Sequence, residues 1–192
     1  MILKNGIELY HASYTPIKKI DLSLCASGKD FGKGFYVTAD YHQACRFLRT
    51  AIGKAIKNKV PNVNEKVGYV SIFEYELCPN SDIKYHEFKT SDVDWLHCIV
   101  AHRKHGILYS ELSKWKYFDI IAGKIANDST NQVLTAYING FYGEVGTYEA
   151  DETAIKFLLP ENLSNQICFR SEKSLTNLCF KDFKIVELEK FK

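Results

Sequence analysis

Short runs of hydrophobic residues, several of them alternating with polar ones, recur along the chain and are typical of strands with at least one buried face. β-branched and aromatic residues are frequent in these runs, and glycine or polar residues bound most of them. The predicted strands cover residues 7–11, 35–38, 67–77, 118–123, 166–169 and 183–188.

Between these runs, apolar residues recur three and four positions apart, which predicts helices over residues 40–58, 92–104, 128–142, 148–159 and 171–178. Asp40 is the expected N-cap of the first helix, and Thr90 or Ser91 of the second. The residues expected to face the core from these two helices are Ala44, Phe47, Leu48, Ala51, Ile52, Val93, Leu96, Ile99 and Val100. Strands and helices are interspersed without a regular strand–helix–strand rhythm. The pattern therefore favours an α+β fold with a mixed or antiparallel sheet.

Composition narrows the class of protein. The chain has 192 residues, of which 46% are hydrophobic and 25% charged, a balance that excludes a disordered or low-complexity chain. This length suits one ordinary domain, so we expect a single domain over residues 1–192. The net charge of +2 gives no sign of a strongly basic, nucleic-acid-binding surface.

The compartment is expected to be cytoplasmic. No apolar run approaches the ~18 residues of a membrane-spanning helix, and residues 1–6 lead into the first strand without a signal peptide. The six cysteines are scattered, with no Cys-x-x-Cys pair, and are expected to be reduced. We expect no membrane contact.

The glycine-rich segment 28–34 fits neither nucleotide-binding motif. A dinucleotide fingerprint needs glycine three residues after Gly34, where Val37 stands, and a P-loop needs a different glycine spacing followed by Lys and Ser or Thr. Both motifs precede a helix, whereas this segment leads into a predicted strand. We therefore expect a mobile loop.

Two further patterns have ordinary explanations. Cys98, His102 and His105 stand at helical spacing but supply too few ligands for zinc, so no metal site is expected. Residues 114–117 interleave cations and aromatics as single-stranded nucleic-acid platforms do. A loop anchored by a buried Trp115 explains the same four residues more simply.

Three short motifs occur in order along the chain. The first is Tyr10-His11-Ala12-Ser13, the second is Gly32-Lys33-Gly34-Phe35-Tyr36 before a predicted helix, and the third is Asn165-Gln166-Ile167. Together they resemble the ADP-ribosyltransferase superfamily in its diphtheria-toxin and poly-ADP-ribose-polymerase branch, and more closely a bacterial family of stand-alone domains within it. The resemblance implies two small packed β-sheets with surrounding helices and a cleft that binds NAD.

The resemblance also implies roles for the motif residues. The residues expected to bind NAD, the co-substrate, are His11, Ser13, Gly34, Tyr36 and Thr38, and those expected to be catalytic are Gln166, His11 and Tyr36. His11 would hydrogen-bond a ribose hydroxyl, and the ring of Tyr36 would lie under nicotinamide. Lys29 and Lys33 are expected to attract the pyrophosphate.

Position 166 departs from the superfamily, whose third motif carries glutamate. Glutamine can hydrogen-bond a ribose hydroxyl but cannot stabilise a sugar cation by charge, and losing one such stabiliser lowers the rate about 100- to 1,000-fold. Three outcomes stay open: a slow transferase, a carboxylate from Asp119, Asp128 or Glu172, or binding without turnover. In a slow transferase, the nearly isosteric Gln166→Glu is expected to raise nicotinamide release.

The expected function is mono-ADP-ribosyl transfer from NAD to a macromolecular target, either protein or nucleic acid. A small cytoplasmic transferase of this kind suggests, by analogy, a bacterial toxin or defence effector with an antitoxin or regulatory partner. The alternatives are a catalytically silent module that binds NAD or ADP-ribose, and an NAD glycohydrolase, in which water is the acceptor.

Overall fold

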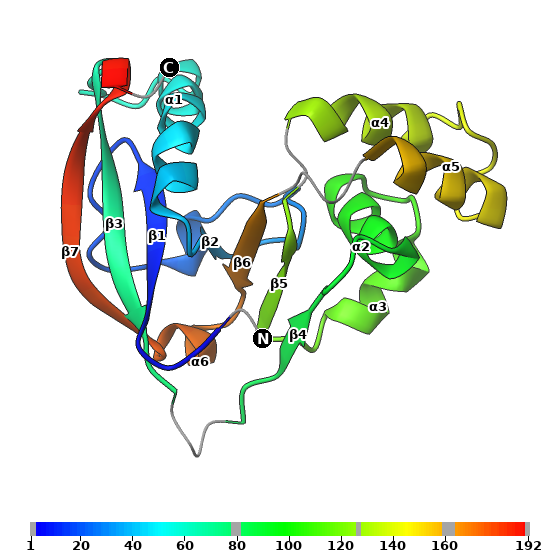
Figure 1. The fold of residues 1–192 in the computed structure, drawn as a ribbon, viewed down its shortest axis with the longest axis horizontal. Coiled ribbons are helices and arrows are strands. Elements are labelled where there is room, and N and C mark those ends of the chain that lie inside the picture. The colour runs from blue at the N-terminus through cyan, green and yellow to red at the C-terminus, as the bar shows by residue number, and fades with distance from the viewer. Residues whose placement is uncertain (1–2, 78–81, 126–127, 159–163, 191–192) are drawn as a thin grey trace. The chain divides into compact units, whose positions relative to one another are not determined.

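The structure is a computed structural model that describes residues 3–77, 82–125, 128–158 and 164–190. Its elements in chain order are β1 (Ile7–Ser13), η1 (Leu22–Leu24), β2 (Phe35–Val37), α1 (Tyr41–Lys57), β3 (Val67–Tyr75), β4 (Tyr85–Glu87), α2 (Val93–Arg103), η2 (Tyr109–Glu111), α3 (Leu112–Trp115), β5 (Ile120–Lys124), α4 (Asp128–Ile138), α5 (Tyr148–Leu158), β6 (Asn165–Phe169), α6 (Glu172–Leu175), β7 (Leu178–Glu187) and η4 (Leu188–Lys190) (Figure 1). The predicted mixture of helices and strands is confirmed.

The described residues form two compact units. The first unit contains residues 3–21, 36–77 and 172–190, and the second contains residues 22–35, 82–125, 128–158 and 164–171. The boundary falls within the short strand β2, between Phe35 and Tyr36.

The first unit is built on an antiparallel sheet with the order β1-β3-β7. Helix α1 packs on this sheet (Figure 1). Leu48 and Ile52 of the helix join a buried cluster with Val70 and Val186. As predicted, Asp40 caps α1, and its Oδ1 accepts from the amides of His42 and Gln43 at 2.8 and 3.2 Å.

The second unit contains strands β4, β5 and β6 of the sheet with the order β2-β6-β5-β4, and β5 pairs antiparallel with β6 and parallel with β4. β5 and β6 are nearly continuous in apolar residues and almost wholly buried. The register places Gly123 of β5 opposite Gln166 of β6. Because β6 is central in its sheet, Gln166 projects from a rigid element.

The structure differs from the sequence predictions at several elements. Asp92, rather than Thr90 or Ser91, caps α2, because its Oδ1 accepts from the amide of Trp95 at 3.1 Å. Strand β4 was not predicted. The short helix expected over residues 171–178 covers only Glu172–Leu175, and β7 begins at Leu178 because that residue pairs with Tyr75. The expected end of α5 at residue 159 lies outside the described residues.

Within the described ranges, the structure has no helix with the length and apolar character needed to cross a membrane. The described cysteines are free thiols, and three of them, Cys45, Cys98 and Cys168, are buried.

Candidate functional site

One isolated bridge in the first unit joins Tyr10 of the first motif to Thr38, the residue that follows β2. The amide of Tyr10 donates to the Thr38 carbonyl at 2.8 Å, and the amide of Thr38 donates back to Tyr10 at 3.0 Å. The Thr38 hydroxyl donates to Gln43 Oε1 at 2.8 Å and accepts from the amide of Asp40. Thr38 is buried, and these bonds tie the residue after β2 to the start of α1.

His11 is held by the second motif. Its Nδ1 donates to the backbone carbonyl of Tyr36 at 2.7 Å, because a carbonyl can only accept. Burial lowers the pKa of His11 below its ordinary 6.5, although this hydrogen bond opposes the shift. The imidazole is therefore neutral at pH 7, with the hydrogen on Nδ1 and the acceptor lone pair on Nε2.

The other predicted residues of the first unit flank this pair. Tyr36 is half-buried on β2, and its carbonyl is the acceptor for His11. Ser13 is buried at the end of β1, opposite Tyr69 of β3. The structure thus brings His11, Tyr36 and Thr38 together and places Ser13 on the same strand as His11.

Gln166, in the second unit, belongs to a buried polar network that the sequence did not indicate. Its Nε2 donates to Asp30 Oδ2 at 2.6 Å. Arg103 of α2 binds the other oxygen of the same carboxylate, with Nε at 2.8 Å and Nη2 at 2.6 Å from Oδ1. Arg103 also donates through Nη1 to Asn131 Oδ1 at 3.0 Å. Asp30 and Gln166 are only 5% and 7% exposed, so this network fixes the glycine-rich segment to β6 and α2.

The glycines of the segment are explained by packing. A Cβ on Gly34 would lie 2.5 Å from Cys168 Sγ and 2.6 Å from the carbonyl oxygen of Phe169, so β2 and β6 approach too closely for any side chain. Gly32 has a φ of +82° and lies against the ring of His102. Gly34, which the sequence predicts to bind NAD, thus also has a structural role in allowing this close approach.

The segment 28–34, which is predicted to be a mobile loop in the absence of ligand, makes several contacts with the rest of the second unit. Phe31 is fully buried and stacks on Phe88, with ring centroids 5.8 Å apart. Lys33, expected to attract pyrophosphate, donates to the Ser23 carbonyl at 3.1 Å. Asp30 adds the charged contacts to Gln166 and Arg103.

The three carboxylates proposed as substitutes for the missing glutamate have different surroundings. Asp119 accepts from the amide of Lys84 at 2.8 Å and from the Ser171 hydroxyl at 2.7 Å, so both of its oxygens hold local structure. Glu172 is exposed at the start of α6, in the first unit. The side chain of Asp128 lies outside the described residues. The carboxylate that contacts Gln166 is Asp30, a residue that sequence reasoning missed.

A second buried network joins three helices of the second unit. His97 Nε2 of α2 donates to Asp151 Oδ2 of α5 at 2.9 Å, and the Tyr137 hydroxyl of α4 donates to Asp151 Oδ1. The amide of Gly146 donates to the Tyr137 oxygen at 3.0 Å. Burial and the bond to Asp151 raise the pKa of Tyr137. These contacts hold α2, α4 and α5 together.

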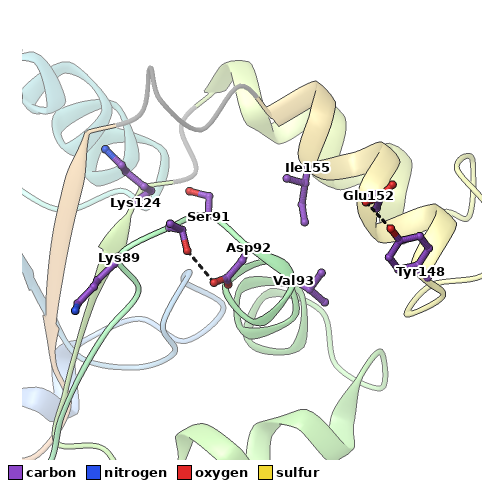
Figure 2. Close-up of a pocket in the computed structure, with 9 residues that line it drawn as sticks. Lys89, Ser91, Asp92, Val93, Lys124, Tyr148, Glu152 and Ile155 are labelled. Atoms are coloured by element: carbon purple, nitrogen blue, oxygen red, sulfur yellow. Dashed lines mark hydrogen bonds between the residues drawn. The ribbon is translucent and has the colours of Figure 1, made fainter.

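A groove of about 550 Å³ lies in the second unit between the start of α2 and one face of α5 (Figure 2). Val93 and Ile155 supply apolar surface, and Tyr148 donates its hydroxyl to Glu152 at 2.7 Å along one wall. None of the residues in the three motifs lines it.

The structure also shows the surroundings of residues 114–117 and of the histidine and cysteine residues of α2. Trp115 is buried at the end of α3, as the anchored interpretation required, whereas Tyr117 is 64% exposed and has Lys116 Nζ 4.7 Å from its ring centroid. His102 Nδ1 donates to the Cys98 carbonyl at 2.7 Å. Among the described residues, no group of three or more His, Cys, Asp or Glu side chains has an arrangement that could hold a metal ion.

Comparison with known proteins gives one match. No curated protein and no solved structure matches the chain. The model of one family, described as protein of unknown function (DUF3990), matches residues 7–180, which is most of the sequence. The chain therefore belongs to the DUF3990 family.

Proposed function

We propose that the protein is an NAD-dependent mono-ADP-ribosyltransferase that modifies a macromolecular target. The observation that carries the proposal is the 2.7 Å hydrogen bond from His11 Nδ1 to the Tyr36 carbonyl. It joins His11 of the first motif to Tyr36 of the second motif, two residues that lie 25 positions apart in the sequence. It also selects the tautomer of His11 that can accept a hydrogen bond from a hydroxyl through Nε2.

The proposed reaction breaks the bond between C1′ of the nicotinamide ribose and the pyridinium nitrogen. The electron pair of that bond leaves with nicotinamide, which becomes neutral, and the ribose takes on cationic character as in glycoside hydrolysis. A hydroxyl, thiol or amine of the target then forms a bond to C1′ and releases its proton to solvent. His11 would hold a ribose hydroxyl, and Tyr36 would support the nicotinamide ring.

A silent NAD-binding module is the second candidate, and the surroundings of Gln166 favour it. The glutamine is uncharged, and the carboxylate beside it, Asp30, is already paired with Arg103 at 2.6 Å. Little negative potential is left to stabilise a sugar cation, so a transferase with this site is expected to turn over slowly.

Calorimetric titration with NAD and an assay of nicotinamide release test the proposal. His11→Ala and Tyr36→Leu should weaken NAD binding and lower release. The matched controls His105→Ala and Tyr109→Ala remove an exposed histidine and an exposed tyrosine and should leave both unchanged. Melting curves on all four variants separate loss of the site from loss of the fold.

Failure to bind NAD would overturn the proposal. NAD binding without nicotinamide release would establish the silent module. If nicotinamide is released, NAD labelled in the adenylate half distinguishes the acceptors, because label stays on a macromolecule after transfer and appears as free ADP-ribose after hydrolysis.

A further inference from the structure

We infer that Asp30 is the positioning residue for Gln166, and that it fixes the glutamine amide so that its carbonyl oxygen serves as the acceptor for a ribose hydroxyl. The inference rests on the proposed function, and it identifies Asp30 as the hydrogen-bond partner of Gln166 in the third motif. The carboxylate that the superfamily carries at position 166 would thus stand one hydrogen bond away, at Asp30.

The orientation of the amide follows from what each group can donate. An ionised carboxylate only accepts hydrogen bonds, so the branch of Gln166 that faces Asp30 must be the NH₂ group. The contact of 2.6 Å from Nε2 to Asp30 Oδ2 is short, as charge-assisted hydrogen bonds are. Because the amide is planar, Oε1 then occupies the opposite branch, where it can only accept.

Asp30 is itself held in one position. Arg103 binds Oδ1 through two nitrogens, at 2.8 and 2.6 Å, and Gln166 binds Oδ2. Gly28 and Gly32, on either side, have φ values of +68° and +82°, backbone conformations that other residues adopt at a cost. A carboxylate that is only 5% exposed is costly to bury without such partners.

The contacts suggest an exchange experiment in which size and shape hardly change. In Asp30→Asn, the oxygen of the introduced asparagine still accepts from Arg103, and its NH₂ group now faces Gln166. The glutamine amide must then flip, so that it presents NH₂ to the ribose hydroxyl in place of the acceptor oxygen. The hydrogen bonds from Arg103 to residue 30 and between residue 30 and Gln166 are kept, but the acceptor oxygen of Gln166 no longer faces the ribose hydroxyl.

The double variant Asp30→Asn/Gln166→Glu exchanges the two groups and keeps the net charge. The NH₂ group of the introduced asparagine donates to the introduced glutamate, which has its second carboxylate oxygen available as an acceptor. We therefore expect Asp30→Asn to lower nicotinamide release about 100-fold. Because this substitution leaves Arg103 without its paired charge, the melting temperature should fall as well, so release is compared at a temperature where every variant is folded. We expect the double variant to restore release to at least the unmodified level.

Asp151→Asn is the control for stability alone, because Asp151 is a buried, hydrogen-bonded carboxylate in the same unit that belongs to a different network. It should lower the melting temperature without a specific loss in kcat. The inference is overturned if Asp30→Asn releases nicotinamide at the unmodified rate, or if the double variant recovers no more activity than Asp30→Asn.

A spectroscopic measurement separates this inference from the proposed function. The side-chain amide resonance of Gln166, assigned by its disappearance in Gln166→Glu, should shift downfield when bonded to Asp30 and move upfield in Asp30→Asn. If the shift is observed but the protein does not bind NAD, the missing binding overturns the proposed function, while the shift still establishes the orientation of Gln166. An amide resonance insensitive to Asp30→Asn would overturn the orientation even in an active enzyme.

Discussion

At the scale of single residues, His11 gives a test based on pH. Burial lowers the pKa of His11 below 6.5. At a pH just below 6.5, the imidazole is therefore still neutral in the folded protein, whereas it takes up a proton in the unfolded chain. The stabilising contribution of the neutral form is complete above about pH 6.5 and is lost as pH falls through the folded pKa. NAD affinity should be constant from about pH 8 to pH 7 and should fall once the Nε2 acceptor is protonated.

The measurement is a ¹⁵N titration of the labelled imidazole. At pH 7 the spectrum should show a neutral ring with its hydrogen on Nδ1. A ring that carries hydrogen on Nε2, or that is charged at pH 7, would contradict the proposed acceptor role. A parallel NAD titration of His105→Ala shows whether pH acts through His11 or through the protein as a whole.

Gln166→Glu changes its expected outcome once the contacts are known. From sequence alone the substitution should raise nicotinamide release, but in the structure it puts a carboxylate against Asp30 Oδ2, where the glutamine now donates at 2.6 Å. Two like charges in contact raise the pKa of one of them, so the variant should lose about 1–3 kcal/mol of unfolding free energy at pH 8.

Urea unfolding at two pH values checks this expectation. Because the raised pKa belongs to the folded state, the loss should be largest above that pKa and should shrink at pH 5, where one carboxyl is protonated. A loss that is equal at both pH values would contradict the carboxylate contact. Gln132→Glu, on the surface of α4, is the control for adding a charge.

The residue scale also shows where sequence reasoning fails. Asp30 and Gln166 are 136 residues apart, and Asp30 lies in a loop segment without a recognised signature. His11 and Tyr36 were identified as candidate site residues because each stands in a motif of the superfamily that the sequence resembles. Pairing one carboxylate with one amide at long range requires the tertiary structure, since nothing local in either segment specifies the contact.

At the scale of elements, local signals gave the best predictions. Asp40 begins α1 and Asn58 ends it, as predicted, because capping depends on neighbouring residues. The buried face was predicted less well: Phe47 is 41% exposed, while Cys45 and Ala55 lie in the core. Helical spacing allows several adjacent faces, and packing against the sheet selects one of them.

Short or nonlocal strands were the weakest predictions. β4 has only three residues and is defined by its parallel pairing with β5, so it carries little periodic signal. β7 begins earlier than predicted because its first residues pair with the end of β3, about a hundred residues before them in the sequence. In both cases the pairing partner, rather than the local sequence, sets the boundaries of the strand.

The N-cap of α1 gives a prediction at this scale. Asp40→Ala should lower the free energy of unfolding by about 1 kcal/mol, because two backbone amides lose their acceptor. Asp40→Asn keeps an acceptor oxygen and should lose less. Chemical denaturation of both variants checks the order, and equal losses would show that charge, rather than capping, is responsible.

The close approach of Gly34 to β6 gives a second prediction at this scale. Gly34→Ala places a Cβ 2.5 Å from Cys168 Sγ and 2.6 Å from a backbone oxygen, so the strands must separate at a cost of about 1–3 kcal/mol. Gly53→Ala is the matched control, because the corresponding Cβ on α1 meets nothing within 4 Å and should stabilise the helix. Opposite signs in the two unfolding free energies are expected, and a neutral Gly34→Ala would contradict the close approach.

At the scale of the whole molecule, composition and pattern gave the fold class. The interspersed helices and strands, without a regular alternation, led to the mixed α+β architecture that the structure confirms. The order of strands in the two sheets could not be predicted, because it depends on pairings between distant segments. The ADP-ribosyltransferase fold and its NAD cleft remain proposals that rest on the three motifs.

The network of His97, Tyr137 and Asp151 gives a prediction for the cohesion of the second unit. Tyr137→Phe keeps the ring and removes the hydroxyl that donates to Asp151 and accepts from the amide of Gly146. A buried carboxylate oxygen and a backbone amide lose a partner, so the unfolding free energy should fall by about 1–3 kcal/mol. Tyr142→Phe, also an aromatic hydroxyl of this unit, is the control.

Hydrogen exchange locates the effect of Tyr137→Phe. Because the lost contacts join α4 to α5 and to the segment before it, amides in these helices should open first, while those of α1 serve as the reference in the same sample. His97→Ala should raise exchange in the same helices, since it removes the other partner of Asp151 at 2.9 Å. In a double-mutant cycle the combined loss should be smaller than the sum of the two single losses, because both act on one carboxylate. Strict additivity, or faster exchange confined to α1, would show that the three side chains do not act as one network.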